Sequence, residues 1–266
     1  MKEIVLKPLY TKIWKGYLRL KILVTTITNY IYYKIYIIKS MLYFLVYNDN
    51  THNDYLDKLL QSVKMYGEEF NIIIFEKNDI DENFISKNKS ILDCYRGGGY
   101  WLWKPYIINE TLKKINDDDI IFYIDSKYYF IEHFANLYVD YMKNNDILVW
   151  KNKPNEPIWY MKNFCKMHVI HKYKMFDKVF SENAEDCWGG ALIVKKTENT
   201  IKYIQEWLDI CCIYEDITDS ESKIENDSLF YEHRHDQSLL SIIIHKYNIQ
   251  MQFFEKKYLQ NVRCPF

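Results

Sequence analysis

The chain carries almost no net charge, and this lack limits the kinds of partner that it can bind. Its 266 residues include 35 lysines and arginines against 36 aspartates and glutamates, which leaves a formal charge of −1 at pH 7. General nucleic-acid binders are usually basic or carry a basic stripe, so we expect no nucleic-acid partner. A hydrophobic content of 48% supplies ample core, so the chain is expected to fold rather than stay disordered.

The sequence also lacks a cysteine pattern that would hold zinc or staple the fold. Its 6 cysteines form no paired Cys-x-x-Cys motifs, and a chain of this length needs no disulfides to be stable. Reduced thiols, most of them structural, are typical of a cytoplasmic protein. We therefore expect a cytoplasmic location.

No uninterrupted apolar run in the first forty residues is long enough for an ordinary membrane span. Ile22 to Ile38 is apolar, but Asn29 and Lys34 interrupt it and Lys39 follows. A spanning helix needs about 20 mostly apolar residues, and no small-residue cleavage site follows. We predict that residues 1–40 form a helical extension, packed on the domain or lying at a membrane surface. A signal anchor stays open as an alternative.

Beyond residue 41, short apolar strands alternate with amphipathic helices. The expected strands are 42–47, 71–75, 120–124 and 146–150, and the expected helices include 54–65 and 105–115. This alternation predicts an α/β domain over residues 41–266, with a central, mostly parallel sheet flanked by helices, as in Rossmann-like folds.

Glycine is scarce, and three of the 7 glycines are adjacent, in the run from Arg96 through Trp101 to Lys104 and Pro105. Glycine reaches positive φ and lets backbone approach a ligand closely. Proline is suited to the first turn of a helix, where free N–H groups favour an anion. We interpret this run as an anion cradle, to which Arg96 and Lys104 add positive charge.

Asp125 directly follows the apolar strand 120–124. A carboxylate at the carboxyl end of a buried strand lies where open α/β sheets bind ligands, and it can hold a divalent cation that bridges two phosphates. The alternative is an aspartate that only ends the strand in a turn.

Two further motifs combine polar and aromatic residues. Residues 232–238, Glu-His-Arg-His-Asp-Gln-Ser, precede an apolar helix. Asp236 can cap that helix, or it can accept hydrogen bonds from sugar hydroxyls while a histidine completes a metal shell. In the second motif, Gly189 and Gly190 lead into a strand. They allow close approach of a ligand or simply form a strand entry, and Trp188 beside them can stack on a sugar face.

In this order and spacing, Arg-Gly-Gly-Gly-Tyr-Trp-Leu-Trp-Lys-Pro-Tyr, Tyr-Ile-Asp-Ser and His-Arg-His-Asp-Gln-Ser resemble a family of small GT-A-fold nucleotide-sugar glycosyltransferases, which is distantly similar to glycogenin-like enzymes. Members occur in polysaccharide loci and in some large viruses. The resemblance covers residues from about 41 to about 252. It implies a nucleotide-sugar-binding half at 41–150 and an acceptor half at 151–266, a UDP- or GDP-sugar donor, and a glycan or other hydroxyl acceptor.

The resemblance also implies roles for single residues. Lys104 matches a lysine that meets the donor, Asp125 matches the metal-binding strand-end aspartate, and Asp236 and Gln237 match the pair that contacts the donor sugar. The second aspartate of the family's Asp-x-Asp motif is absent, because Lys127 stands there. Lys127 can itself supply positive charge, and this places dependence on Mn²⁺ or Mg²⁺ in doubt.

The motifs and the resemblance together give a set of candidate site residues. The catalytic candidates are Asp125 and Asp236, with Glu185 as an alternative base. The donor-binding candidates are Tyr47, Arg96, Gly97, Gly98, Lys104, Asp125, Ser126 and Gln237. The acceptor-binding candidates are Trp188, Gly189 and Gly190, and the metal candidates are Asp125, His233 and His235.

Two other functions remain open from the sequence. A nucleotidyltransferase shares the α/β layout and a phosphate cradle but releases pyrophosphate. A non-catalytic module that binds nucleotides or glycans would explain the missing second aspartate.

Overall fold

The computed structural model describes residues 17, 20, 21, 24, 40–50, 53–66, 70–134, 141, 142, 144–151, 159–253 and 258–262. The chain divides into two compact units, Met1–Met41 and Leu42–Phe266. The predicted helical extension at 1–40 lies almost wholly outside the described residues. No helix in the described ranges is both long and apolar enough to cross a membrane.

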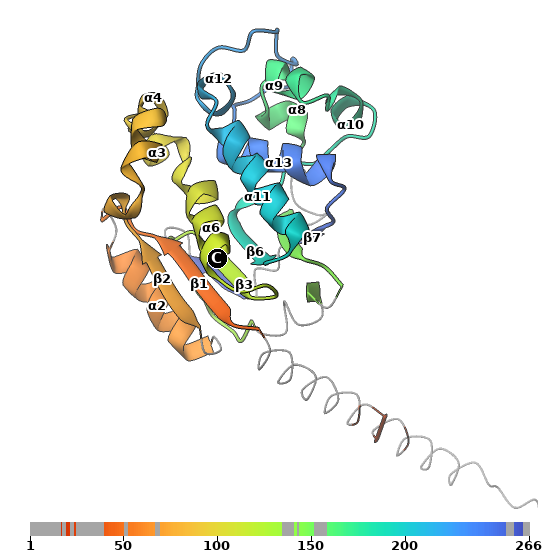
Figure 1. The fold of residues 1–266 in the computed structure, drawn as a ribbon. Coiled ribbons are helices and arrows are strands. Elements are labelled where there is room, and N and C mark those ends of the chain that lie inside the picture. Colours follow the sequence, from red (N-terminus) through yellow and green to blue (C-terminus); the bar gives the residue numbers. More distant parts are fainter. Residues whose placement is uncertain are drawn as a thin grey trace, which may run out of the picture. The chain divides into compact units, whose positions relative to one another are not determined.

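A six-stranded mixed sheet forms the centre of residues 42–266 (Figure 1). Its strand order is β2 (Asn71–Phe75), β1 (Leu42–Tyr47), β3 (Ile120–Ile124), β6 (Trp188–Lys195), β5 (Ile147–Lys151) and β7 (Met251–Phe253). Strand β6 runs antiparallel to both of its neighbours, and the other pairings are parallel. The prediction of an α/β fold with a mostly parallel sheet is confirmed. A separate antiparallel pair joins β4 (Tyr128–Phe130) to β8 (Leu259–Asn261).

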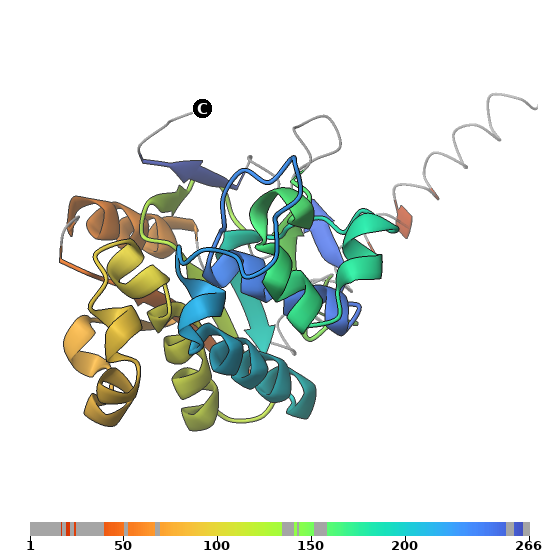
Figure 2. The same ribbon diagram turned by 90° about the horizontal axis from the view of Figure 1, so that it is seen from above.

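The four inner strands of the sheet, β1, β3, β6 and β5, are buried on both faces because their side chains alternate between two cores, whereas the edge strands β2 and β7 are largely exposed. Leu45 and Tyr123 belong to the larger core, to which three helices contribute: α6 (Trp103–Lys114), α11 (Glu198–Cys211) and α13 (Asp236–Lys246). Helices α6 and α11 pack side by side (Figure 2). On the other face Phe44 and Phe122 join a cluster of aromatic rings, near which α2 (Asn53–Tyr66) packs against β4. Continuous apolar strands such as β3 are the sequence pattern expected for such double burial.

Short helices fill the connections. They are α3 (Glu82–Lys87), α4 (Lys89–Leu92), α5 (Gly97–Tyr100), α8 (Met161–Phe164), α9 (Met167–Lys172), α10 (Phe176–Phe180) and α12 (Tyr214–Ile217), with a 3₁₀ turn at Lys77–Asp79. Most predicted elements match closely: the strand expected at 146–150 lies one residue later, at 147–151, and the helix expected at 105–115 begins two residues earlier, at Trp103.

The glycine run forms a left-handed turn. All five residues from Gly97 to Trp101 have positive φ, between 52° and 95°. At Gly99 an added Cβ would lie 2.7 Å from the Cα of Leu92, and at Gly97 it would lie 2.5 Å from the Trp101 ring. The glycines are therefore required by backbone conformation and close packing, and the turn feeds the chain directly into α6.

We predict that Gly99→Ala destabilises the fold more than Gly98→Ala. Both variants place alanine at positive φ, which costs about 1 kcal/mol. Gly99→Ala adds a clash with the backbone of Leu92, whereas the nearest atom to a Cβ at Gly98 is 3.7 Å away. Overpacking of this kind costs a further ~1–3 kcal/mol. Urea unfolding of both variants measures the difference, and equal losses would contradict the steric reason for Gly99.

Candidate active site

A pocket of about 260 Å³ opens at the carboxyl end of β3. Its position follows from the topology, since the antiparallel pairing of β3 with β6 sets Ile124 opposite Ala191. The end of β3 therefore meets the start of β6, and the Asp125 amide donates to the Gly190 carbonyl at 2.9 Å. The pocket is lined by Arg96, Trp101, Lys104, Asp125, Lys127, Tyr128, Trp159, Trp188, Gly189, Gly190, Glu232, Arg234, His235, Asp236 and Gln237.

The structure brings together most of the candidate site residues from distant parts of the sequence. Nine of them line this pocket: Arg96, Lys104, Asp125, Trp188, Gly189, Gly190, His235, Asp236 and Gln237. Tyr47, Gly97, Gly98, Ser126 and His233 are not among its lining residues. Tyr47 stacks on Trp103 instead, with ring centroids 4.0 Å apart. The functional roles assigned to these residues stay predictions.

Lys104, the second residue of α6, contacts three other segments that line the pocket. It is 4% exposed, and its ammonium lies 2.8 Å from Asp236 Oδ2 and 3.6 Å from Asp125 Oδ1. It also donates to the Gly189 carbonyl at 2.9 Å. Burial opposes its charge, but the two carboxylates raise the pKa of Lys104 above its ordinary value. Lys104 thus connects α6 to β6, to the end of β3 and to the start of α13.

Asp125 is held between a hydroxyl and two ammonium groups. Its Oδ1 accepts a hydrogen bond from the Tyr123 hydroxyl at 2.6 Å, and its Oδ2 lies 3.4 Å from the Lys127 ammonium. Burial favours the protonated acid, but Lys104 and Lys127 lower the pKa of Asp125 below its usual value. The carboxylate is therefore ionised at neutral pH.

Asp236 is the first residue of α13, and its carboxylate binds Lys104 rather than capping the helix. Burial raises the pKa of Asp236 to about 6, against the opposing effect of Lys104. The preceding residue, His235, has φ 55° and ψ −122°. A non-glycine residue in this region of φ/ψ space is strained, and such strain is concentrated at functional sites.

Gln237 is oriented by a buried carboxylate that sequence reasoning missed. Its Nε2 donates to Asp186 Oδ2 at 2.6 Å, and its Oε1 accepts from the Gly189 amide at 3.0 Å. The other oxygen of Asp186 accepts from the Ser241 hydroxyl at 2.7 Å. An added Cβ at Gly189 would lie 3.0 Å from the Cβ of Gln237. The one sequence signal for Asp186 is a charged residue just ahead of the buried strand β6.

A network of exposed charges surrounds the mouth of the pocket. Arg96 pairs with Asp219 at 3.0 Å and with Glu232 at 3.5 Å. Glu232 also binds Nε of Arg234 at 2.7 Å, whose guanidinium lies over the Trp159 ring at 4.7 Å. The two terminal amino groups of Arg234 donate no hydrogen bond to any residue in the described part of the chain. Trp101, Tyr128 and Trp159, which were not among the candidate site residues, also line the pocket.

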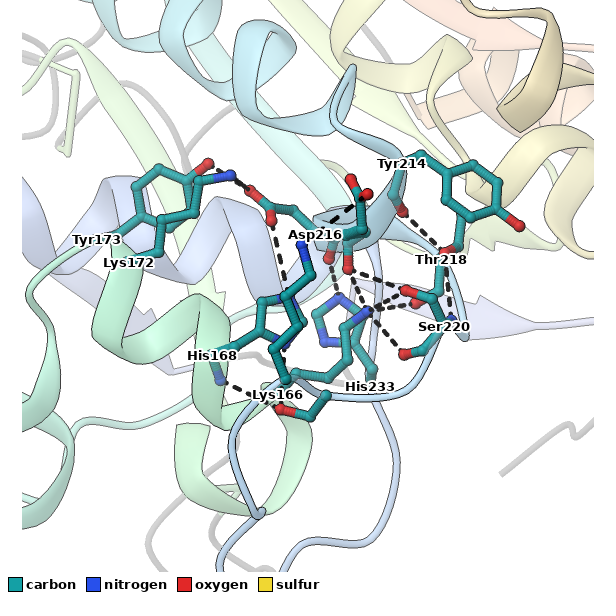
Figure 3. Close-up of polar contacts among 12 residues, drawn as sticks. Lys166, His168, Lys172, Tyr173, Tyr214, Asp216, Thr218, Ser220 and His233 are labelled. Atoms are coloured by element: carbon teal, nitrogen blue, oxygen red, sulfur yellow. Dashed lines mark hydrogen bonds and ion pairs between the residues drawn. The ribbon is translucent and has the colours of Figure 1, made fainter.

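A second buried network holds the segment that follows α12 (Figure 3). The Lys166 ammonium donates to the carbonyls of Thr218 and Ser220 at 2.8 and 3.2 Å. His233 Nε2 hydrogen-bonds the Asp216 carbonyl at 2.7 Å. Burial lowers the pKa of Lys166 to about 8. The network fixes the backbone on both sides of Asp219, the partner of Arg96.

The residues present fit a divalent cation poorly. His233 is engaged with Asp216, and Asp125 already faces Tyr123, Lys104 and Lys127. His235 lines the pocket, but its Nδ1 binds the Ile217 carbonyl and its Nε2 is 3.7 Å from Asp219. The residues that the structure describes contain no group of three histidine, cysteine or acidic side chains arranged to hold a metal. A metal held by Asp125, His233 and His235 stays a prediction.

We predict that Asp186→Asn gains stability relative to the wild type as pH rises from 5 to 7. Burial raises the pKa of Asp186 to about 6. A raised acid pKa gives stability that is present below pH ~4 and is lost as pH rises through about 6. Asparagine does not titrate, and its oxygen can still accept from Gln237. The free energy of unfolding of the variant should therefore rise by about 1 kcal/mol relative to the wild type over this range.

Urea unfolding at pH 5, 6 and 7 measures this difference. Ser241→Ala serves as the matched control, because it removes a partner of Asp186 and leaves the carboxylate in place. A difference between Asp186→Asn and the wild type that does not change with pH would show that Asp186 is not shifted by burial.

No protein-family model matches the chain, and no curated protein matches it. Several solved structures are similar, and three glycosyltransferases are among them. The apo form of the bifunctional glycosyltransferase WbbM is 10% identical over 82% of this chain and 39% of that one, with a TM-score of 0.48. Mouse xyloside xylosyltransferase 1 is 8% identical over 82% and 85%, with a TM-score of 0.44. The glycosyltransferase GlyE of Streptococcus pneumoniae TIGR4 is 12% identical over 82% and 46%, with a TM-score of 0.44. The chain spans less than half of the length of the first and third of these proteins.

Proposed function

We propose that this protein is a glycosyltransferase of the GT-A class, which transfers a hexosyl group from a UDP- or GDP-sugar to a hydroxyl of a glycan or other acceptor. The observation that carries the proposal is the composition of one pocket at the carboxyl end of β3. Cationic side chains, the neighbouring carboxylate and amide of Asp236 and Gln237, and tryptophan rings line the same 260 Å³ space. A nucleoside diphosphate sugar presents the matching groups: two phosphates, hydroxyls and an apolar sugar face.

The cations suit a diphosphate. Arg96, Lys127 and Arg234 line the pocket with side chains that are 46%, 38% and 32% exposed. Charge-assisted hydrogen bonds from such groups to phosphate oxygens are among the strong ones in proteins, and guanidinium groups bind phosphate with two parallel bonds. Lys104 differs, since its burial and its pairing with Asp236 leave it little capacity for a ligand.

Other residues of the lining suit a sugar. Asp236 and Gln237 carry the carboxylate and amide that the family resemblance assigns to the donor sugar, and Trp188 offers a ring for stacking. Aromatic rings combined with a few fixed polar groups are typical of small-molecule pockets. The strained backbone of His235, directly before Asp236, supports a functional origin for this arrangement.

The proposed reaction breaks the bond between the anomeric carbon and the diphosphate oxygen, whose electron pair stays with the departing phosphate. An acceptor hydroxyl forms the new bond to the anomeric carbon and loses its proton. The transition state is oxocarbenium-like, as in glycoside hydrolysis, and Arg96 and Lys127 offset the negative charge that grows on the leaving group.

Asp236 is the better candidate for a base in an inverting reaction, because it lines the pocket and a pKa of about 6 leaves it ionised at pH 7. Glu185 pairs with Lys151 and is not among the lining residues. A retaining reaction needs no such base.

The direct test is a thermal-shift screen of nucleoside diphosphates and their sugars with the full chain. A ligand at a hundred times its dissociation constant adds about 2.7 kcal/mol, which raises Tm by roughly 5–10 °C for a chain of this size. Product analysis then separates the alternatives, since a glycosyltransferase releases the nucleoside diphosphate and a nucleotidyltransferase releases pyrophosphate. No shift with any nucleotide would overturn the proposal.

We predict that Arg96→Gln weakens the binding of the nucleoside diphosphate about tenfold, because the loss of a charge-assisted hydrogen bond costs about 1.5–3 kcal/mol. The ion pairs of Arg96 are exposed, so Tm without ligand should change by no more than about 2 °C. Calorimetric titration measures the affinity. Lys89→Gln is the matched control, since Lys89 is an exposed cation that pairs with Asp93 and is not part of the pocket lining. Equal affinity in both variants would remove Arg96 from the site.

A further inference from the structure

We propose that the Lys127 ammonium takes the place of a divalent cation at the end of β3, so that the pocket binds a nucleoside diphosphate without metal. This inference rests on the proposed function, since it concerns how the same pocket holds a diphosphate. It explains why a lysine stands two residues after Asp125, where the family resemblance expects a second acidic residue.

The geometry places the Lys127 ammonium against the strand-end carboxylate of Asp125. The Lys127 ammonium is 3.4 Å from Asp125 Oδ2 and 5.3 Å from the centroid of the Tyr128 ring. Its side chain lines the pocket and is 38% exposed. The group is therefore held against the carboxylate and still has hydrogen-bonding capacity for a ligand, since an ammonium has three donors.

The surroundings of Asp125 leave little room for a second cation. Lys104 lies 3.6 Å from the other carboxylate oxygen, which also accepts the Tyr123 hydroxyl. A divalent ion bound at Asp125 would thus lie close to two ammonium groups, and like charges at such distances repel even in a polar environment. Mn²⁺ and Mg²⁺ also favour several oxygen ligands, whereas Asp125 is the one carboxylate on the three residues from 125 to 127.

The chemistry of the leaving group is compatible with a lysine in this position. A metal at a phosphate acts by offsetting negative charge as the sugar–oxygen bond breaks, without any proton transfer. An ammonium held by Asp125 does the same by charge and hydrogen bonding, and lysine is an established phosphate binder that acts as a point charge. Arg96 and Arg234, which also line the pocket, supply further positive charge to the same ligand.

The test compares nucleotide binding with EDTA and with Mn²⁺, using UDP and GDP as probes and thermal shift and calorimetric titration as readouts. For the wild-type chain we expect the same affinity, within about twofold, in both conditions. Lys127→Met should bind at least tenfold more weakly in both conditions. Lys127→Asp restores the pattern Asp-x-Asp. It should bind as weakly as Lys127→Met in EDTA and regain at least tenfold in affinity when Mn²⁺ is added.

Electron paramagnetic resonance provides a readout that does not depend on nucleotide or activity. Mn²⁺ added to Lys127→Asp should lose its free-ion signal, whereas Mn²⁺ added to the wild type should keep it. Lys202→Asp is the matched control, because Lys202 is an exposed lysine on α11 and its replacement makes the same change in net charge. This control should behave as the wild type does in every assay.

The outcomes separate this inference from the proposed function. Binding of UDP or GDP to the wild type only when Mn²⁺ is present would overturn the role of Lys127 and keep the glycosyltransferase proposal. Failure of Mn²⁺ to restore binding to Lys127→Asp above the level of Lys127→Met would show that position 127 is not at the cation position. Absence of binding to the wild type in either condition would overturn both proposals.

Discussion

The rest of the candidate site depends on the buried ion pairs that the Lys104 ammonium forms with two carboxylates. Its charge is out of water and is balanced by Asp236 at 2.8 Å, with Asp125 at 3.6 Å. Removal of one partner from a buried ion pair commonly costs 3–5 kcal/mol, since the remaining charge is left uncompensated. The fold therefore keeps the starts of α6, β6 and α13 together at the end of β3. The left-handed glycine turn contributes to this arrangement, because it lets α6 begin at Trp103 and so buries Lys104, the second residue of the helix.

From Lys104, a continuous chain of hydrogen bonds leads through Gly189 to the Gln237 side chain and fixes its orientation. The ammonium binds the Gly189 carbonyl, the Gly189 amide binds Gln237, and Gln237 binds Asp186. The two contacts of the Gln237 side chain determine which way its amide points, since one atom must accept and the other must donate. Gly189 has no Cβ, and one built there would press on Gln237. The floor of the pocket is thus preorganised, which is the condition for electrostatic stabilisation of a transition state.

The sequence predicted what depends on local pattern and missed what depends on distant partners. Strands β1 and β3 were recognisable because burial on both faces makes them continuous apolar runs. Edge strand β2 was recognisable from its three consecutive isoleucines, although most of its residues are exposed. Asp125 was recognisable because it directly follows strand β3, and Asp236 because it directly precedes the apolar part of α13. Asp186 was not, because its role depends on Gln237, 51 residues away. The glycine run was interpreted as an anion cradle, and that role stays a prediction. The structure adds a steric reason for Gly97 and Gly99, and neither Gly97 nor Gly98 is among the pocket-lining residues.

The charges of the pocket fall into a fixed set and an adaptable set. The side chains of Lys104 and Asp236 are 5% exposed and form an ion pair at 2.8 Å, whereas those of Arg96 and Lys127 are 46% and 38% exposed. Exposed ion pairs contribute little to stability, so a diphosphate can replace the carboxylate partners of Arg96 at small cost. The buried pair cannot be exchanged in this way without a large loss. Under the proposed function, the buried charges would hold the sugar in one orientation, and the exposed cations would exchange their carboxylate partners for the diphosphate as the nucleotide enters and leaves.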